Sequence, residues 1–92
     1  MKALWFKGEY VEPILTGAKD STVRRAATCR VFAGETVRAT VGPRPHFAIL
    51  QITKREDITL ADLDADYRRD VQRLYPAEEH FVRITFTTIQ EQ

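Results

Sequence analysis

The spacing of apolar residues is the feature that most restricts what this chain can fold into. In residues 32–42, and again in residues 80–89, apolar and polar side chains alternate, which is the pattern of a half-buried β-strand. In residues 58–76 the apolar side chains instead recur at steps of three and four: Leu60, Leu63, Tyr67, Val71 and Leu74. That spacing indicates an α-helix. The chain therefore has to combine strands with a helix.

Local signals predict the remaining elements. In chain order they are a strand at residues 3–6, a helix of about two turns at residues 9–17, a strand at residues 21–26 and a strand at residues 46–53. Gly17 is placed to end the first helix in a left-handed conformation, and Thr59 to cap the second, with Asp62 three residues on. In residues 32–42 we expect two faces: Val37, Ala39 and Val41 inward, Arg38 and Thr40 outward.

The order of these elements predicts an α+β fold. A small mixed β-barrel or curled sheet, with helices at its openings, accommodates a strand, a helix, several strands, a helix and a closing strand. The proline loop at residues 42–45 suggests a hairpin between its two neighbouring strands. A chain of 92 residues fits one domain, and we assign residues 1–92 to it.

Composition restricts compartment and cofactors. No stretch approaches the roughly 20 apolar residues that cross a bilayer, and the first residues lack the apolar region of a signal peptide. Cys29 is the only cysteine, so we expect no internal disulfide and a location in the reducing cytoplasm. We also expect a monomer without membrane contact. His46 and His80 show no metal-ligand spacing with Cys29. We expect neither a metal nor another cofactor.

Charge is distributed unevenly along the chain. Residues 1–55 contain ten Lys and Arg against four Asp and Glu, whereas residues 56–92 contain four against nine. Such halves can simply attract each other within one domain. Alternatively, the first half forms a basic face that meets phosphate.

The segment at residues 17–25 carries the densest group of reactive side chains. Lys19 and Thr22 lie three residues apart across a turn, and Thr22 and Arg24 share one face of the following strand. Neighbouring arginines lower the pKa of a lysine, which can then act as a base and activate a threonine hydroxyl for attack on an acyl group. The alternative is structural: Lys19 solvates a turn and the arginines pair with the acidic half.

The same segment resembles the N-terminal signature of the ASCH domain, a member of the PUA-like superfamily. That signature consists of an apolar strand, a short helix and the pattern Gly-x-Lys-x-x-Thr/Glu-x-Arg, which Gly17, Lys19, Thr22 and Arg24 match. The likeness continues through residues 32–41 and through "RLYP" before the last strand, and so covers essentially the whole chain.

The resemblance implies a PUA-like barrel of five to six strands with two or three helices at its openings. It also implies a cleft, between barrel and helices, that binds RNA or a nucleoside. One bacterial branch, the 4-acetylcytidine amidohydrolases, uses a threonine, a lysine and a glutamate, and Thr22 and Lys19 match the first two. The glutamate segment is shortened here to residues 60–70, where Asp64 or Asp66 would have to substitute. Other relatives are linked to ribonuclease activity or to RNA binding alone.

Two functions therefore stay open, and a ribonuclease that uses the same cleft is a further alternative. As an amidohydrolase, the protein would bind the substrate base near Trp5, Phe6 or Tyr10, and Arg24 or backbone amides would stabilise the oxyanion. As a binding module, it would contact phosphate through basic side chains and stack a base on an aromatic ring. The candidate cations are Lys19, Arg24, Arg25 and Arg44. Each aromatic residue can equally belong to the core.

Overall fold

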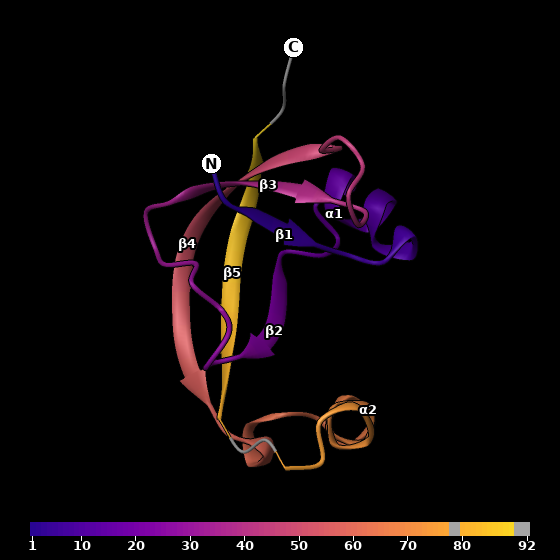
Figure 1. Ribbon diagram of the computed structural model, residues 1–92, viewed down its shortest axis with the longest axis vertical. Helices are drawn as coiled ribbons and strands as arrows, with labels where there is room; N and C mark the ends of the chain where they lie inside the picture. Colours follow the sequence, from indigo (N-terminus) through magenta and orange to yellow (C-terminus); the bar gives the residue numbers. More distant parts are fainter. Residues whose placement is uncertain (78–79, 90–92) are drawn as a thin grey trace.

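A strongly curved five-stranded sheet dominates the computed structural model, which describes residues 1–77 and 80–89 (Figure 1). Along the sheet the strands lie in the order β1-β3-β4-β5-β2. Their bounds are Ala3–Trp5 for β1, Ser21–Arg25 for β2, Thr36–Thr40 for β3, Ala48–Ile58 for β4 and Phe81–Ile89 for β5. The long strands β4 and β5 arch through the molecule, and β1 and β3 cross its upper end (Figure 1). This is the α+β curled sheet that the sequence predicts.

The strand pairing leaves two edges, β1 and β2. Strand β1 pairs in parallel with β3, whereas all other neighbours are antiparallel. A bulge between Ile52 and Lys54 shifts the register of β4 against β5, which adds to the curvature. The sheet is thus half a barrel, and β1 and β2 face each other across its open side.

Helices lie at the two ends of the sheet, as expected. A short 3₁₀ turn at Gly8–Tyr10 leads into α1, Val11–Thr16, beside the upper strands, and α2, Ala65–Leu74, lies at the opposite end (Figure 1). Gly17 ends α1 at φ 84°, as predicted. None of the described helices has the length and apolar character needed to span a membrane.

The main core fills the concave side of the sheet. It contains these buried residues: Leu4, Phe6, Ile14, Cys29, Val31, Val37, Ala39, Ala48, Leu50, Ile52, Val82, Ile84 and Phe86. The ring of Phe6 meets those of Phe47 and Phe86 edge to face, with centroids 6.5 and 6.2 Å apart. Strand β2 contributes Thr22 to this side, directly opposite Ile84 of β5.

A second, smaller cluster holds α2 to the end of the sheet. Its buried members are Ile58, Leu63 and Phe81, with Val23, Leu60 and Val71 packed against them. Val23 is the residue through which β2 joins this satellite cluster. The helix is therefore held by contacts separate from those of the main core.

The prediction of a single helix over residues 58–76 is wrong, because two separate helices lie within this range. The capping box of Thr59 and Asp62 is present but caps only a 3₁₀ turn at Leu60–Asp62. Asp64 then has an extended backbone, ψ 164°, and its carboxylate caps α2. Two N-caps five residues apart interrupt the helix that the apolar spacing alone indicates.

The side chain of Arg68 fixes the angle between these two helices. Its guanidinium donates to the carbonyl oxygens of Leu60 and Leu63, both at 2.9 Å. The junction carbonyls thereby find partners that an uninterrupted helix would have supplied.

Strand β3 departs from its expected faces at its end. Val37 and Ala39 are fully buried and Arg38 is exposed, as predicted, but Thr40 is buried and Val41 only half-buried. The strand stops at Thr40, which pairs with Trp5 of β1, and the chain turns at Gly42 with φ 58°. Alternation cannot continue where the extended backbone ends.

We predict that Gly17→Ala lowers the free energy of unfolding by about 1–2 kcal/mol, because an alanine has to adopt the left-handed conformation. Gly8→Ala is the matched control. A methyl group meets open space at both positions, and only Gly17 has a positive φ. Chemical denaturation should therefore show a change within about 0.5 kcal/mol for Gly8→Ala. Equal losses in the two variants would contradict this account of how α1 ends.

Candidate functional site

Lys19 lies in the loop between α1 and β2, where both its backbone and its side chain contact neighbouring residues. Its backbone N–H donates to the carbonyl of Pro13 at 2.9 Å, which fixes the loop to α1. The ammonium donates to the carbonyl of Ser21 at 2.8 Å and lies 4.6 Å from the ring centroid of Tyr10. The side chain is therefore held on the free edge of β2.

The environment of Lys19 disfavours its charged form. Burial lowers its pKa, the positive charge of Arg24 lowers the pKa further, and the carboxylate of Asp20 acts in the opposite direction. This is the shift that a lysine base requires.

Thr22 and Arg24 share a face of β2, as predicted. Thr22 is only 7% exposed, and its hydroxyl oxygen accepts a hydrogen bond from Arg24 Nε at 3.2 Å. Arg24 Nη2 reaches across the open side of the sheet to the carbonyl of Trp5, at 2.7 Å. Its guanidinium also lies 5.0 Å from the ring centroid of Phe6. Arg24 thus connects the two edge strands.

A cavity of about 190 Å³ brings three of the predicted catalytic residues together. We call it the Lys19 cavity; it is lined by Lys19, Ser21, Thr22, Val23, Leu63, Asp64, Tyr67 and Arg83. Asp64 uses Oδ1 to accept from the backbone of Tyr67 at 2.9 Å. Asp66 is not part of the cavity: its side chain is 94% exposed and pairs with Arg69 at 3.8 Å.

Tyr67 and Arg83 line this cavity and were not predicted. Burial raises the pKa of Tyr67, whereas a backbone hydrogen bond with Val23 and the nearby arginines lower it. Tyr67 occurs at an apolar helical spacing, which suggested a core residue. Arg83 pairs directly with Val23 across β5 and β2. The sequence feature that could have identified Arg83 as a candidate site residue is its outward position in an alternating strand.

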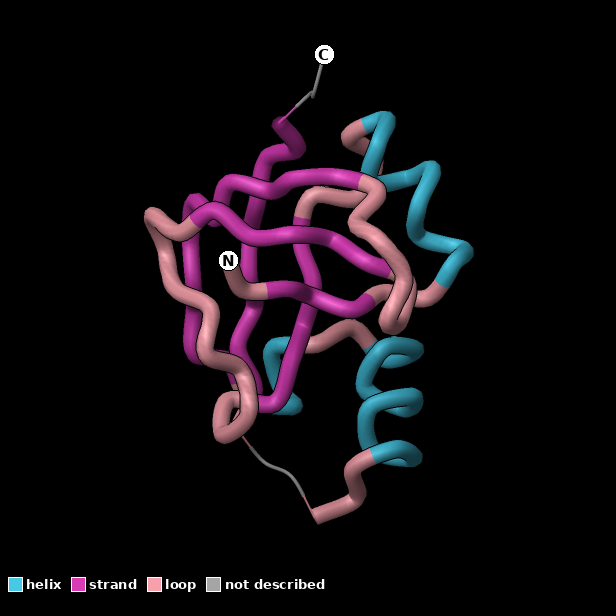
Figure 2. Tube along the Cα trace, turned by 45° about the horizontal axis from the view of Figure 1, so that its top comes forward, coloured by secondary structure: helices cyan, strands magenta, loops and turns pink. Residues whose placement is uncertain are grey.

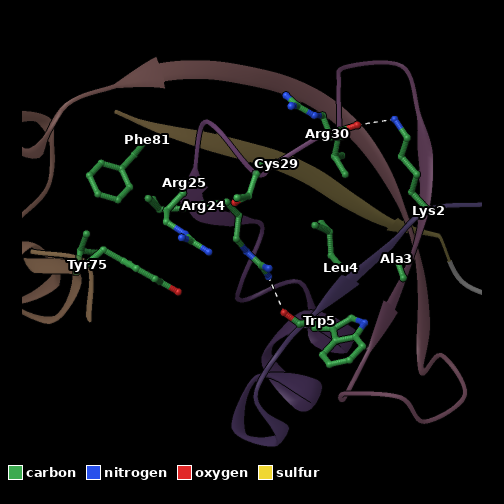
Figure 3. A pocket seen from close by; sticks show the side chains of 14 residues that line it. Lys2, Ala3, Leu4, Trp5, Arg24, Arg25, Cys29, Arg30, Tyr75 and Phe81 are labelled. Atoms are coloured by element: carbon green, nitrogen blue, oxygen red, sulfur yellow. Dashed lines mark hydrogen bonds between the residues drawn. The ribbon is translucent and has the colours of Figure 1, made fainter. Parts of the chain in front are cut away.

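A larger cavity of about 520 Å³ lies beside the first. We call it the Trp5 cavity; it is lined by Lys2, Ala3, Leu4, Trp5, Val23, Arg24, Arg25, Thr28, Cys29, Arg30, Val31, Val71, Tyr75 and Phe81. Figure 3 shows basic side chains from three segments around it, with Trp5 at one side and Tyr75 at the other. Among the described residues that line it, four are cationic and none is acidic.

The cations of the Trp5 cavity differ in how far they are engaged. Lys2 binds Glu35 at 2.9 Å and donates to the carbonyl of Arg30. Arg25, the last residue of β2, lies 4.4 Å from the ring centroid of Tyr75. The side chain of Arg30 is exposed, and within the described residues no acidic group pairs with it.

The remaining predicted binding residues are dispersed. Trp5, 60% exposed, lines the Trp5 cavity, but Phe6 is packed in the core at 7%. Tyr10 is half-buried beneath Lys19. Arg44 is exposed in the loop between β3 and β4, and it lines neither cavity. Lys2, Arg30 and Tyr75 were missed because only the fold brings them to this side.

The two cavities adjoin along one strand and one helix. Val23 lines both, and β2 forms one wall throughout. The opposite wall consists of Leu63, Asp64 and Tyr67, around the start of α2, in one cavity and of Val71 and Tyr75, around its end, in the other. Figure 2 shows α2 standing beside the sheet. Across residues 1–77 and 80–89, no three His, Cys, Asp or Glu side chains are grouped so as to hold a metal ion.

Solved structures share the fold of this chain. A protein of Enterococcus faecalis V583, of the family DUF984, superimposes with a TM-score of 0.74 at 15% identity, over 96% of this chain and 79% of the other. An ASCH domain from Lactobacillus crispatus gives 0.74 at 11% identity, over 95% and 78%. The chain has the fold of an ASCH domain.

A third similar structure is a mutant form of ZmASCH from Zymomonas mobilis, with a TM-score of 0.66 at 13% identity, over 97% of this chain and 69% of that protein. No family model matches the sequence, and no curated protein sequence matches it either. At these identities the likeness establishes the ASCH fold alone.

We predict that the pKa of Lys19 moves in opposite directions in two variants. Arg24→Gln should raise it partway toward its ordinary value, because burial remains, and Asp20→Asn should lower it further. Carbon NMR titration of labelled lysines measures both. The folded protein binds this proton less tightly than the unfolded chain, so Lys19 should make the protein more stable as pH rises from the folded pKa toward 10.5. Shifts of the same sign would contradict the assigned causes.

Proposed function

We propose that this ASCH-fold protein binds RNA or a modified pyrimidine nucleoside in the two cavities between β2 and α2. The observation that carries the proposal is the lining of the Trp5 cavity, where the described residues comprise four cations, an exposed tryptophan and no carboxylate. Cations attract phosphate, and an exposed aromatic ring offers a surface on which a base stacks. The volume of about 520 Å³ lies within the usual range of ligand sites.

The positions of the acidic residues support this proposal. Asp66 and Asp70 pair with Arg69 and Arg73 on the exposed side of α2, outside both cavities. The small net charge of +1 is therefore compatible with a basic Trp5 cavity, because acidic groups such as Asp66 and Asp70 lie outside it.

We expect RNA binding to weaken steeply as salt concentration rises, because phosphate contacts release bound counterions. Arg25→Gln should reduce the slope of log affinity against log salt by about 1. Arg69→Gln, which removes the same charge from the outer side of α2, is the matched control and should leave the slope unchanged. Fluorescence anisotropy with a labelled single-stranded RNA measures both. A flat salt response would refute the binding proposal.

A second candidate function is hydrolysis of the acetyl amide of 4-acetylcytidine. The observation that favours it is that Lys19, Thr22 and Asp64 line one cavity. Neutral Lys19 can still donate to the Ser21 carbonyl and gains a lone pair for the Thr22 proton. Because the Thr22 oxygen already accepts from Arg24, its own O–H proton is free to be transferred to a base.

The reaction then proceeds in two balanced steps. Lys19 takes the proton of Thr22, whose oxygen attacks the acetyl carbon, and Arg24 stabilises the developing negative charge. The bond between acetyl carbon and base nitrogen breaks, and the Lys19 ammonium protonates the leaving amine. In the second step water, oriented by Oδ2 of Asp64, attacks the acetyl carbon of the ester on Thr22. The bond between that carbon and the Thr22 oxygen breaks, the remaining water proton returns to Thr22, and acetic acid leaves and ionises to acetate.

We predict that Thr22→Val and Lys19→Met each lower kcat/KM for 4-acetylcytidine by about 100-fold or more. Asp64→Asn should slow the reaction, whereas Asp66→Asn, which alters a carboxylate outside the cavity, should not. Activity should rise with pH up to the lowered pKa of Lys19, because the base has to be neutral. Chromatographic detection of cytidine measures each rate. Turnover that is unchanged in Lys19→Met would exclude this mechanism.

A further inference from the structure

We propose that the ligand is a single-stranded oligonucleotide whose target base enters the Lys19 cavity and whose neighbouring nucleotide occupies the Trp5 cavity. This inference rests on the proposed function and narrows its substrate class from any pyrimidine nucleoside to a strand of RNA. The Trp5 cavity is then the subsite that distinguishes a strand from a free nucleoside.

The sizes of the two cavities argue for a ligand that extends across both. The Lys19 cavity, at about 190 Å³, falls below the usual range for a complete small-molecule site, whereas the Trp5 cavity, at about 520 Å³, lies within it. Because Val23 lines both, the two cavities lie next to each other along β2. A ligand that placed only a base in the smaller part would leave the larger part empty.

The charges in the larger cavity suit phosphodiester groups, which a free nucleoside lacks. Arg24 is committed to the carbonyl of Trp5 and to Thr22, and Lys2 to Glu35. Arg25 rests on an aromatic face that uses none of its N–H groups, and Arg30 is exposed. These two guanidinium groups can each offer paired N–H donors to a phosphate.

The exposed Trp5 ring selects for a single strand. A base stacks on an aromatic side chain only when it has left its own helical stack, which duplex RNA prevents and single strands allow. Trp5 is 60% exposed at the rim of the cavity, where the ring is available to a flanking base. It is also the only tryptophan of the chain, so its fluorescence reports on this subsite alone.

The test compares 4-acetylcytidine with a single-stranded RNA tetranucleotide that contains one 4-acetylcytidine. The tetranucleotide should bind about tenfold more tightly or better, and it alone should quench Trp5 fluorescence. Calorimetry gives the affinities. When the same four nucleotides are base-paired within the stem of a longer RNA hairpin, that RNA should not quench the fluorescence of Trp5.

Two matched variants locate the effect. Arg30→Gln should weaken the tetranucleotide several-fold and leave the nucleoside unchanged, whereas Arg44→Gln, in an exposed loop outside both cavities, should change neither. Lys19→Ala should weaken both ligands. Equal affinities for nucleoside and tetranucleotide, or equal losses in Arg30→Gln and Arg44→Gln, would overturn the strand proposal while leaving nucleoside binding intact. Absence of binding by both ligands would overturn the proposed function as well.

Discussion

The guanidinium of Arg24 is the contact on which the open side of this sheet depends. A half-barrel leaves β1 and β2 facing each other without backbone pairing, and Arg24 bridges them through the carbonyl of Trp5. The same group donates to Thr22 and covers the ring of Phe6. One side chain therefore sets the separation of the two edges, orients the hydroxyl in one cavity and forms part of the wall of the other. Its charge also lowers the pKa of Lys19.

The residues that protect the edge of β2 are also the candidate functional ones. An edge strand presents unpaired backbone groups that invite pairing with another chain. Here the ammonium of Lys19 covers the carbonyl of Ser21, Tyr67 lies with Val23 in the wall of the Lys19 cavity, and the turn that follows the strand donates to the carbonyl of Arg25. These groups cover the edge in place of another strand, and Lys19 and Tyr67 also line the candidate site.

The sequence predicted what depends on local spacing. Alternation identified the strands, Gly17 ended its helix, and the spacing of Lys19, Thr22 and Arg24 indicated a shared site. It could not predict the Trp5 cavity, because Lys2, Arg30 and Tyr75 meet only after β1, the loop following β2 and α2 have folded together. The apolar spacing from Leu60 to Leu74 also concealed a break, since a second cap at Asp64 outweighs the periodicity. In that pattern Tyr67 occupies a position expected for a core residue, whereas in the structure it lines the Lys19 cavity.

The two separate hydrophobic clusters stabilise different parts of the molecule. The sheet is stabilised by one set of side chains, whereas α2 is attached through a small set around Leu63 and Phe81 and through Arg68. The space between β2 and α2 is therefore shaped by residues outside the main core. Substitutions under this one helix can change the shape of the two cavities, while the core that supports Lys19 and Thr22 stays the same.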